Sequence, residues 1–298
     1  MPRAIQYSRL PTERRHPHSD ALDRLSIPHL LRLMNREDAG VVRAVARALP
    51  QIARAVRLTA RSLRRGGRLV FIGAGTSGRL GVLEAAECPP TFSTSPSLVQ
   101  AIMAGGRGAV FRAREGAEDR AADARRQIER RLRAGDVAVG LTASGVTPFV
   151  AEALRIAARR GARTVLISAH PHPAIPAACR ICLAVGPELL TGSTRLKAGT
   201  ATKLALNMLT LGAMVRLHKT YGNLMVDVRP TSRKLTARAI GIIQSTARTS
   251  EPAAAAALRD ARGRVKLAVL MAAEGLTLAA ARRRLARAGG ALRRALRA

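Results

Sequence analysis

Aromatic residues are nearly absent from this 298-residue chain: they make up 2% of it, and Trp is missing altogether. Proteins that hold single-stranded nucleic acid without sequence preference stack its bases on aromatic side chains, so the sequence excludes a platform of that kind. Hydrophobic residues still make up 47% of the chain, which excludes wholesale disorder. The core must therefore be built mainly from Ala, Leu, Val and Ile side chains.

Acidic residues are also scarce, with 19 Asp and Glu against 51 Lys and Arg, and the formal net charge is +32. Only five of the basic residues are Lys, so 46 are Arg. Such a surplus would suit nucleic acid or another anionic partner. The alternative is a compositional bias that uses Ala and Arg as default residues of helix surfaces. The even spread of Arg along the chain favours the bias, so we expect no specific nucleic-acid partner.

Cysteines are too few for a disulfide framework, which indicates a protein of the reducing cytoplasm. There are three, and Cys179 and Cys182 form a lone C-x-x-C that two half-buried thiols explain more simply than zinc or redox chemistry. The six His show no metal-site spacing. No apolar run approaches the ~20 residues that cross a bilayer, and Met1–Arg15 lacks the apolar core of a signal peptide. We therefore expect no metal and no membrane partner.

The hydrophobic pattern predicts an α/β domain with a largely parallel sheet. Residues 1–25 are polar and suggest an extended arm, and residues 26–63 have helical spacing that Pro50 should divide. Beyond them, short apolar runs that indicate strands alternate with helical segments. The strands are expected at 68–73, 98–103, 136–142, 163–168 and 181–185, and the helices at 78–87, 117–132, 148–159 and 197–219.

After Arg238 the composition changes to Ala, Arg and Leu, with short helices expected at 250–258, 265–274 and 277–288. The last segment, 277–298, carries many Arg and no acid, which would also suit a membrane or nucleic-acid surface. Its regularly spaced leucines favour a small bundle with one buried stripe: Leu278, Leu285, Leu292 and Leu296. We thus expect N-terminal helices in 1–55, a main domain in 56–238 and a small helical domain in 239–298.

Two loops rich in Gly, Ser and Thr each follow a predicted strand and precede a predicted helix. They are Gly73–Gly78 (GAGTSG) and Thr142–Pro148 (TASGVTP). Glycines allow close backbone approach, and helix N-termini offer free N–H groups to a phosphate. The carboxyl ends of parallel strands are where open α/β sheets bind ligands. The hydroxyl groups and the lack of a stacking aromatic favour a sugar phosphate over a nucleotide, although ordinary tight turns would also explain each loop alone.

Carboxylate pairs lie near these loops. Glu84 and Glu87 are three residues apart on one helix face, and Pro89 and Pro90 are expected to end that helix, which would place Glu87 at its partly buried rim. Glu115–Asp119 (EGAED) is expected to open the next helix. Such pairs suit general acid/base catalysis, but simple pairing with the surplus Arg explains them equally well. Ser193 and Lys197, in a loop before a long helix, could add anion contacts or merely cap that helix.

Taken together, these stretches resemble the bacterial N-acetylmuramic acid 6-phosphate etherases of the sugar isomerase domain superfamily. The resemblance runs from about Thr12 to Leu292, and the most specific text is GAGTSGRLGVLEAAECPPT, EGAED, LTGSTRLKAGTAT and YGNLMVDV. It implies a three-layer domain with a parallel sheet. It also implies a carbon–oxygen lyase that cleaves the D-lactyl ether of N-acetylmuramic acid 6-phosphate to N-acetylglucosamine 6-phosphate and D-lactate. The resemblance places this reaction in cell-wall amino sugar recycling or catabolism, and it implies that the enzyme needs no cofactor and forms a homodimer.

Site residues follow from the resemblance by position. Glu87 and Glu118 match the two catalytic carboxylates, with Glu87 as the expected acid and Glu118 as the expected base. The substrate and phosphate ligands implied are Gly75, Thr76, Ser77, Gly78, Ser144, Gly145, Thr147, Ser193 and Lys197. The chain departs from the family where His16 replaces Asn and Val146 replaces Arg. The alternative is a non-catalytic regulatory protein that binds sugar phosphates, like the glucokinase regulatory protein.

Overall fold

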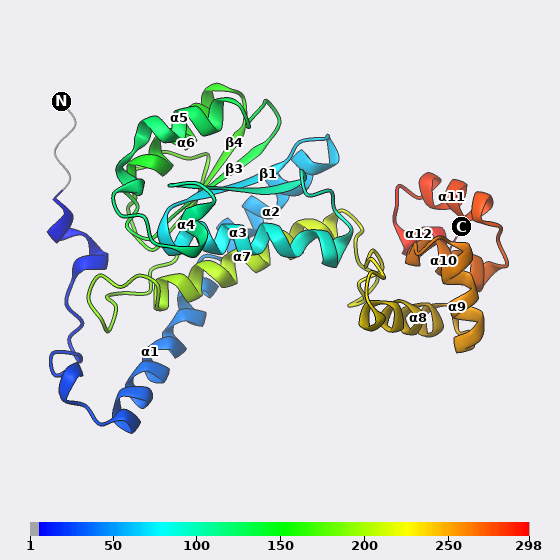
Figure 1. Ribbon diagram of the computed structural model, residues 1–298, viewed down its shortest axis with the longest axis horizontal. Coiled ribbons are helices and arrows are strands. Elements are labelled where there is room, and N and C mark those ends of the chain that lie inside the picture. The colour runs from blue at the N-terminus through cyan, green and yellow to red at the C-terminus, as the bar shows by residue number, and fades with distance from the viewer. Residues whose placement is uncertain (1–5, 298) are drawn as a thin grey trace. The chain divides into compact units, whose positions relative to one another are not determined.

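The chain divides into two compact units in a computed structural model, which describes residues 6–297 (Figure 1). One unit comprises Met1–Ala86 and Ser97–Thr210, and the other Glu87–Pro96 and Leu211–Ala298. The short segment 87–96 therefore belongs with the C-terminal part of the chain. The three-domain division expected from the sequence stays a prediction.

Five parallel strands form the sheet of the first unit in the order β2-β1-β3-β4-β5. Gly73, the last residue of β1, is level with Met103 at the end of β2 and with Leu141 on β3, so the carboxyl ends of these strands share one edge. The expected parallel α/β sheet is thus confirmed. The strand bounds are β1 (Leu69–Gly73), β2 (Val99–Met103), β3 (Val137–Thr142), β4 (Arg163–Ser168) and β5 (Cys179–Cys182).

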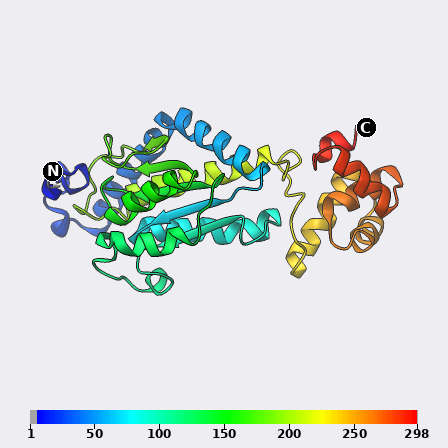
Figure 2. The ribbon, with the colours of Figure 1, turned by 90° about the horizontal axis from the view of Figure 1, so that it is seen from above.

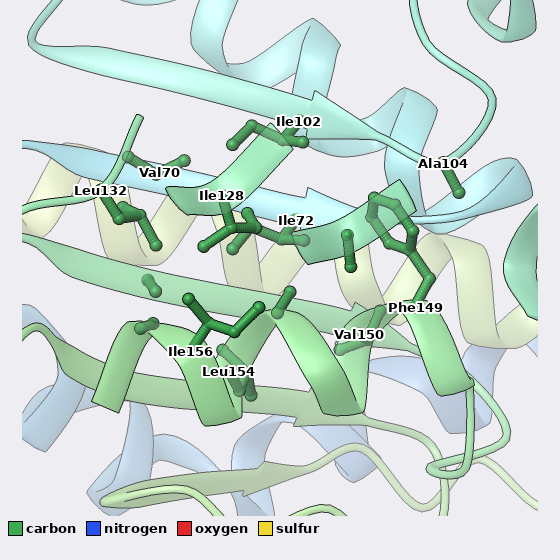
Figure 3. Packing of buried hydrophobic residues seen from close by; sticks show 14 of the residues in the cluster. Val70, Ile72, Ile102, Ala104, Ile128, Leu132, Phe149, Val150, Leu154 and Ile156 are labelled. Atoms are coloured by element: carbon green, nitrogen blue, oxygen red, sulfur yellow. The ribbon is translucent and has the colours of Figure 1, made fainter. Parts of the chain in front are cut away.

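Helices cover both faces of the sheet and give the expected three layers. Val70 and Ile72 of β1 face a buried cluster with Ile128 of α5 and Phe149 of α6, which Figure 3 shows from close by. The alternate residue Phe71 faces α3, where a Cβ on Gly81 would lie 2.9 Å from its Cβ. The helices are α1 (Ile27–Arg47), α2 (Leu49–Arg64), α3 (Gly75–Phe92), α4 (Gly108–Phe111), α5 (Ala121–Glu129), α6 (Pro148–Arg159) and α7 (Lys197–Arg216).

A buried ion pair joins β1 and β3 at their amino ends. Asp136 is 0% exposed, and its carboxylate accepts hydrogen bonds from the backbone N–H of Arg68 at 2.9 Å and from Arg68 Nη2 at 2.7 Å. The backbone N–H of Arg133 donates to the same carboxylate at 3.0 Å. Because a buried carboxylate is stable only when it is paired and hydrogen-bonded, these contacts fix the register of the two strands at this end.

Residues of the second unit form a bundle of short helices, drawn from yellow to red in Figure 2. Its core holds Ile243, Leu270 and Leu292, while Leu278, Leu285 and Leu296 pack against it, so the expected leucine stripe is confirmed as buried packing. Ser250 and Thr277 cap two of the helices by accepting backbone N–H groups. The helices are α8 (Arg233–Ala247), α9 (Glu251–Asp260), α10 (Val265–Glu274), α11 (Leu278–Arg287) and α12 (Leu292–Ala295). The sequence did not predict α8 or α12.

Three expectations about local structure were wrong. Helix α3 continues through Pro89 and Pro90 to Phe92 instead of ending before them. The EGAED segment does not open an α-helix, because Ala117–Asp119 forms a 3-10 turn before α5. The N-terminal arm is not extended: within residues 6–25 it forms 3-10 turns at Tyr7–Arg9, Pro11–Glu13 and Leu22–Arg24.

The division of the first helical stretch was predicted correctly. Helix α1 ends at Arg47 and α2 begins at Leu49, with Pro50 in the first turn of α2, where its missing N–H costs no hydrogen bond. Over residues 6–297, none of the helices is both long enough and apolar enough to cross a membrane.

Candidate functional site

The first glycine loop turns sharply from β1 into α3. Helix α3 begins at Gly75, three residues earlier than expected, so Thr76 and Ser77 lie in its first turn, where backbone N–H groups have no partner within the helix. A Cβ on Gly78 would lie 2.7 Å from the carbonyl oxygen of Gly73, so only glycine fits there. Gly75 has a φ of +51°, which also favours glycine. The loop thus presents hydroxyl groups and free N–H groups at one point.

A network of hydroxyl groups shapes the second loop, which turns from β3 into α6. Thr142 Oγ1 lies 2.8 Å from Thr147 Oγ1 and accepts the backbone N–H of Gly145 at 3.2 Å. Ser144 Oγ lies 3.3 Å from Thr142 Oγ1 and accepts the N–H of Val146 at 3.4 Å. Thr147 is buried, whereas Ser144 is half-buried. Ser144 therefore reaches toward solvent, while Thr147 holds the loop.

A third helix start lies beside the first loop. A Cβ on Gly199, in the first turn of α7, would lie 3.6 Å from Thr76 Cγ2 of α3. Ser193 is half-buried in the preceding loop, where its backbone N–H donates to Leu190. The starts of α3 and α7 are thus neighbours at the carboxyl edge of the sheet, and their N-termini both favour negative charge.

Lys197 points into a buried cluster of charged groups. Its side chain is 4% exposed, and its Nζ donates to Glu37 Oε2 at 2.9 Å. His16 Nε2 lies 2.9 Å from the same oxygen. The structure thus shows Lys197 in an ion pair that the sequence did not predict, since Glu37 is 160 positions away and has no motif around it.

Glu188 caps the N-terminus of α7. It is buried and accepts the backbone N–H groups of Lys197 at 3.0 Å and Ala198 at 2.9 Å. Burial raises the pKa of its carboxyl, and the two N–H donors and the charge of Lys197 oppose that rise. In the sequence, the only sign of this capping role is that Glu188 stands nine residues before the helix start, in a chain with few acidic residues.

Glu84 is hydrogen-bonded to two side chains of α7. It is buried in the first unit, where its carboxylate accepts hydrogen bonds from Asn207 Nδ2 at 2.8 Å and from Thr210 Oγ1, so that it joins α3 to α7. Glu87 lies three residues on, belongs to the second unit and is exposed. The expectation that Glu87 is partly buried at a helix rim was therefore wrong, because the helix does not end at the prolines.

Glu118 stands on the 3-10 turn beyond β2. A Cβ on Gly105, just after β2, would lie 3.3 Å from the Cβ of Ala117, which places this turn at the carboxyl edge of the sheet. Partial desolvation of the Glu118 carboxyl raises its pKa, and the like charges of Asp119 and Glu115 raise it further. The residue as a whole is nevertheless exposed. A carboxyl with a raised pKa is suited to proton transfer near neutral pH.

A polar cavity of about 620 Å³ adjoins this turn. Its lining includes Gly105, Arg114, Glu115, Arg120 and Asp123. Arg114 also donates to the carbonyl of Gly105 at 2.9 Å. The mixture of guanidinium and carboxylate groups fits a polar ligand better than an apolar one.

The remaining expectations concern Cys and metals. Cys179 is buried and Cys182 half-buried on β5, and burial raises the pKa of both thiols, as expected for structural thiols. Among the residues that the structure describes, no three His, Cys, Asp or Glu side chains come together in a way that could hold a metal ion.

A five-stranded parallel sheet between two helix layers, with hydroxyl-rich loops leading from β1 and β3 into helices, defines a SIS domain. The family model described as "Glucokinase regulatory protein N-terminal SIS domain" matches residues 51–158. At whole-chain level the chain is similar to proteins named N-acetylmuramic acid 6-phosphate etherase, and it belongs to that family.

Two of these relatives show how far the similarity extends. The etherase of Symbiobacterium thermophilum is 48% identical over 274 residues, which cover 91% of each chain. That of Gloeobacter violaceus is 54% identical over 273 residues, which cover 90% of this chain and 89% of the relative. Among solved structures, a protein from Bacteroides fragilis described as a phosphosugar isomerase involved in capsule formation matches with a TM-score of 0.49 and 17% identity, over 64% of this chain and 91% of that one. The identification of the family rests on the sequence relatives.

Proposed function

We propose that the chain cleaves the D-lactyl ether of N-acetylmuramic acid 6-phosphate to give N-acetylglucosamine 6-phosphate and D-lactate, as a cytoplasmic step in the recycling or catabolism of cell-wall amino sugars. The observation that carries the proposal is the 48–54% identity to etherases over nine-tenths of the chain. The carboxyl edge of the sheet adds a physical argument, since its loops suit a phosphorylated sugar.

The phosphate of the substrate is proposed to bind where α3 begins. Ser77 and Thr76 supply hydroxyl groups, and the first turn of α3 supplies N–H groups that lack partners within the helix. Ser144 is placed to donate a hydroxyl from the neighbouring loop, and Gly75, Gly78 and Gly145 let the backbone approach the ligand. Ser193 is proposed as a further contact, whereas Lys197 and Thr147 act by holding the loops, because Lys197 pairs with Glu37 and Thr147 with Thr142.

The reaction proposed is an elimination followed by hydration. An unactivated ether resists direct hydrolysis, but opening the sugar ring to its aldehyde acidifies the proton on C2. A base removes that proton, the C3–O bond breaks, and an acid protonates the departing lactate oxygen. Water then adds across the resulting C2–C3 double bond, which restores a hydroxyl on C3 and a proton on C2. The atoms balance without any change of oxidation state overall, so the route calls for no redox cofactor.

Glu118 and Glu87 are proposed as the base at C2 and the acid toward the lactate oxygen. The raised pKa of Glu118 suits a carboxylate that accepts and returns a proton. Glu87 is assigned by its match to the family motif in GVLEAAECPP.

We further propose that the protein is a homodimer. Helix α7 exposes Met208, Leu211 and Val215, which are 39–52% exposed and lie on one helical face at spacings of three and four residues. Exposed apolar residues in a row on one helix are typical of an interface. Light scattering should report twice the 31.6 kDa chain mass, and Leu211→Glu with Val215→Glu should give monomers.

The decisive experiment is incubation with N-acetylmuramic acid 6-phosphate in heavy-oxygen water, with an assay for D-lactate and mass spectrometry of both products. The proposal expects lactate release with the label in the sugar at C3, because elimination breaks the C3–O bond. Label confined to lactate would refute the mechanism. Binding of the sugar phosphate without lactate release would instead favour a regulatory protein, the alternative that the matching SIS domain model raises.

A further inference from the structure

The second unit contains a cavity of about 860 Å³ whose lining is strongly cationic. Six Lys and Arg side chains line it, against one carboxylate, that of Asp227. The cavity lies between α10, α11 and the segment 227–231, all of which belong to the second unit. It is therefore a feature of the C-terminal bundle itself.

Two lysines form the floor of this cavity. Lys266 is buried, and its Nζ donates to Asp227 Oδ2 at 2.9 Å and to the carbonyl of Gly290 at 3.1 Å. Lys219 Nζ lies 3.1 Å from the same carboxylate oxygen. One carboxylate thus serves two ammonium groups, so the floor keeps a net positive charge. The composition strengthens the point, because Lys is rare here: two of the five lysines in a chain of 46 arginines lie at this place.

Four arginines form the walls of the cavity, and none of them makes an ion pair within residues 6–297. They are Arg229, Arg262, Arg264 and Arg282. The turn that carries Arg262 is held in the left-handed region, with φ of +54° there and +72° at Gly263. A Cβ on Gly263 would lie 3.2 Å from Pro230, so this turn packs against the opposite wall. The backbone that carries Arg262 is thus held against the segment that carries Arg229.

An uncapped helix start adds to the positive charge. Arg264 occupies the N-cap position of α10, and no side chain accepts the N–H groups of the first turn. The residues of that turn, Val265, Lys266 and Leu267, all line the cavity. Helices α8, α9 and α11 have a Ser or Thr cap, whereas α10 and α12 have none, and it is the first turn of α10 that lines the cavity.

We propose that this cavity, lined by Lys219, Lys266, Arg264 and Arg282, binds a small phosphorylated metabolite that carries several negative charges. Phosphate oxygens would take hydrogen bonds from the guanidinium groups and from the start of α10, the two donors that recognise phosphate best. Leu285 and Val228 supply an apolar wall for the rest of the molecule. The lining of the cavity includes none of the residues proposed for the etherase reaction.

The test uses the full chain and inorganic pyrophosphate as the probe, in phosphate-free buffer at low ionic strength. Calorimetry compares the wild type with Arg264→Gln/Arg282→Gln and with a matched control, Arg283→Gln/Arg287→Gln. The control removes the same charge from exposed arginines of α11 that do not line the cavity. We expect the cavity variant to bind about tenfold or more weakly, and the control to stay within about twofold, since charge-assisted hydrogen bonds are lost only in the first. Any contribution of the sheet-edge loops is the same in all three proteins.

Residue-specific protection places the binding event. Pyrophosphate should slow the modification of Arg264 and Arg282 by phenylglyoxal, as read by mass spectrometry, and leave that of Arg283 unchanged. If the first variant fails to fold, Arg229→Gln/Arg262→Gln replaces it. Equal weakening in both variants, no weakening in either, absence of binding by the wild type, or equal protection of Arg283 would each overturn the proposal. So would tight binding of a short DNA duplex that depends on these arginines more than pyrophosphate binding does.

Discussion

Lys197 Nζ and Glu37 Oε2 lie 2.9 Å apart, and this pair joins the start of α7 to the middle of α1. Burial alone would raise the pKa of Glu37, but hydrogen bonds from Lys197 and His16 outweigh it and hold that pKa below its ordinary value. The imidazole of His16 completes the cluster.

Glu37→Gln should lower the free energy of unfolding by about 2 kcal/mol at neutral pH. The loss leaves a buried ammonium without its charge partner, a change that costs ~3–5 kcal/mol in fully buried pairs and less here because Glu37 is partly exposed. A carboxyl with a lowered pKa stabilises the fold above its ordinary titration range and loses that effect as the pH falls through the folded pKa. Urea unfolding at several pH values should therefore show a smaller loss of stability in acid for the variant. Glu129→Gln, an exposed change on α5, should stay within about 0.5 kcal/mol, and a similar effect in both would contradict the assignment.

Glu87→Gln should abolish lactate release in a folded protein. The substitution removes the ionisable proton and little volume, and general acid catalysis contributes at least ~10²-fold. Initial rates of D-lactate formation measure the loss, and the thermal unfolding midpoint checks the fold. Turnover close to that of the wild type would show that Glu87 is an exposed surface acid without a catalytic role.

Asp119→Asn should shift the acidic limb of the kcat/KM profile to lower pH. The charge of Asp119 helps to raise the pKa of Glu118, so its removal makes the proposed base ionise at lower pH. The limb is measured from rates between about pH 4 and pH 8. Asp260→Asn, at the exposed end of α9, serves as the control and should leave the limb in place. An unmoved limb in Asp119→Asn would argue that another group sets it.

Ser77→Ala and Ser144→Ala should each raise KM for the phosphorylated substrate about tenfold or more. A hydroxyl that donates to an ionised phosphate contributes roughly 1.5–3 kcal/mol. Ser245→Ala, which removes a hydroxyl bonded to a helix carbonyl in α8, should leave KM unchanged. Equal turnover of unphosphorylated N-acetylmuramic acid would show that these loops do not hold a phosphate.

Binding of random duplex DNA should be weak and should fall steeply with salt. Scattered arginines neutralise phosphates without reading sequence, so the affinity should follow the release of counterions. Filter binding between about 50 and 200 mM salt measures the slope. Deletion of residues 240–298 should mainly destabilise the chain, because it removes most of the core of the second unit. Tight, sequence-selective binding at physiological salt that is lost with this deletion would favour a nucleic-acid function.

The parts of the fold that the sequence predicted well are those with a local signal. Strands β1, β3 and β4 are apolar runs closed by Gly, Ser or Thr, and apart from Arg163 their residues are buried on both faces of the sheet. Pro50 divides α1 from α2 because a proline is accommodated in a first turn. The two glycine loops were likewise readable, since their composition and their position after strands are both local.

What escaped prediction depends on contacts between distant residues. Pro89 and Pro90 are strong helix breakers, yet α3 runs through them, with Cys88 and Phe92 buried on either side. The N-terminal arm is held against the loop before α7, because the backbone N–H of Gly192 donates to the carbonyl of Thr12, 180 positions earlier in the chain. Glu84 has a catalytic-looking spacing to Glu87, and only its partners on α7 show that it joins two helices.

The buried pair of Arg68 and Asp136 lies at the edge of the sheet opposite the glycine loops. Variation in the loops leaves that pair untouched, whereas loss of Asp136 would release the register that sets Gly73 level with Leu141. For protein engineering, the loop side chains at the carboxyl edge of the sheet are therefore the positions to vary, and the Arg68–Asp136 pair at the amino edge is to be kept. A library that varies Thr76, Ser77, Ser144 and Val146 would search for new phosphorylated substrates. It would keep the loop glycines and Thr147, which shape the loops, together with Arg68, Arg133 and Asp136.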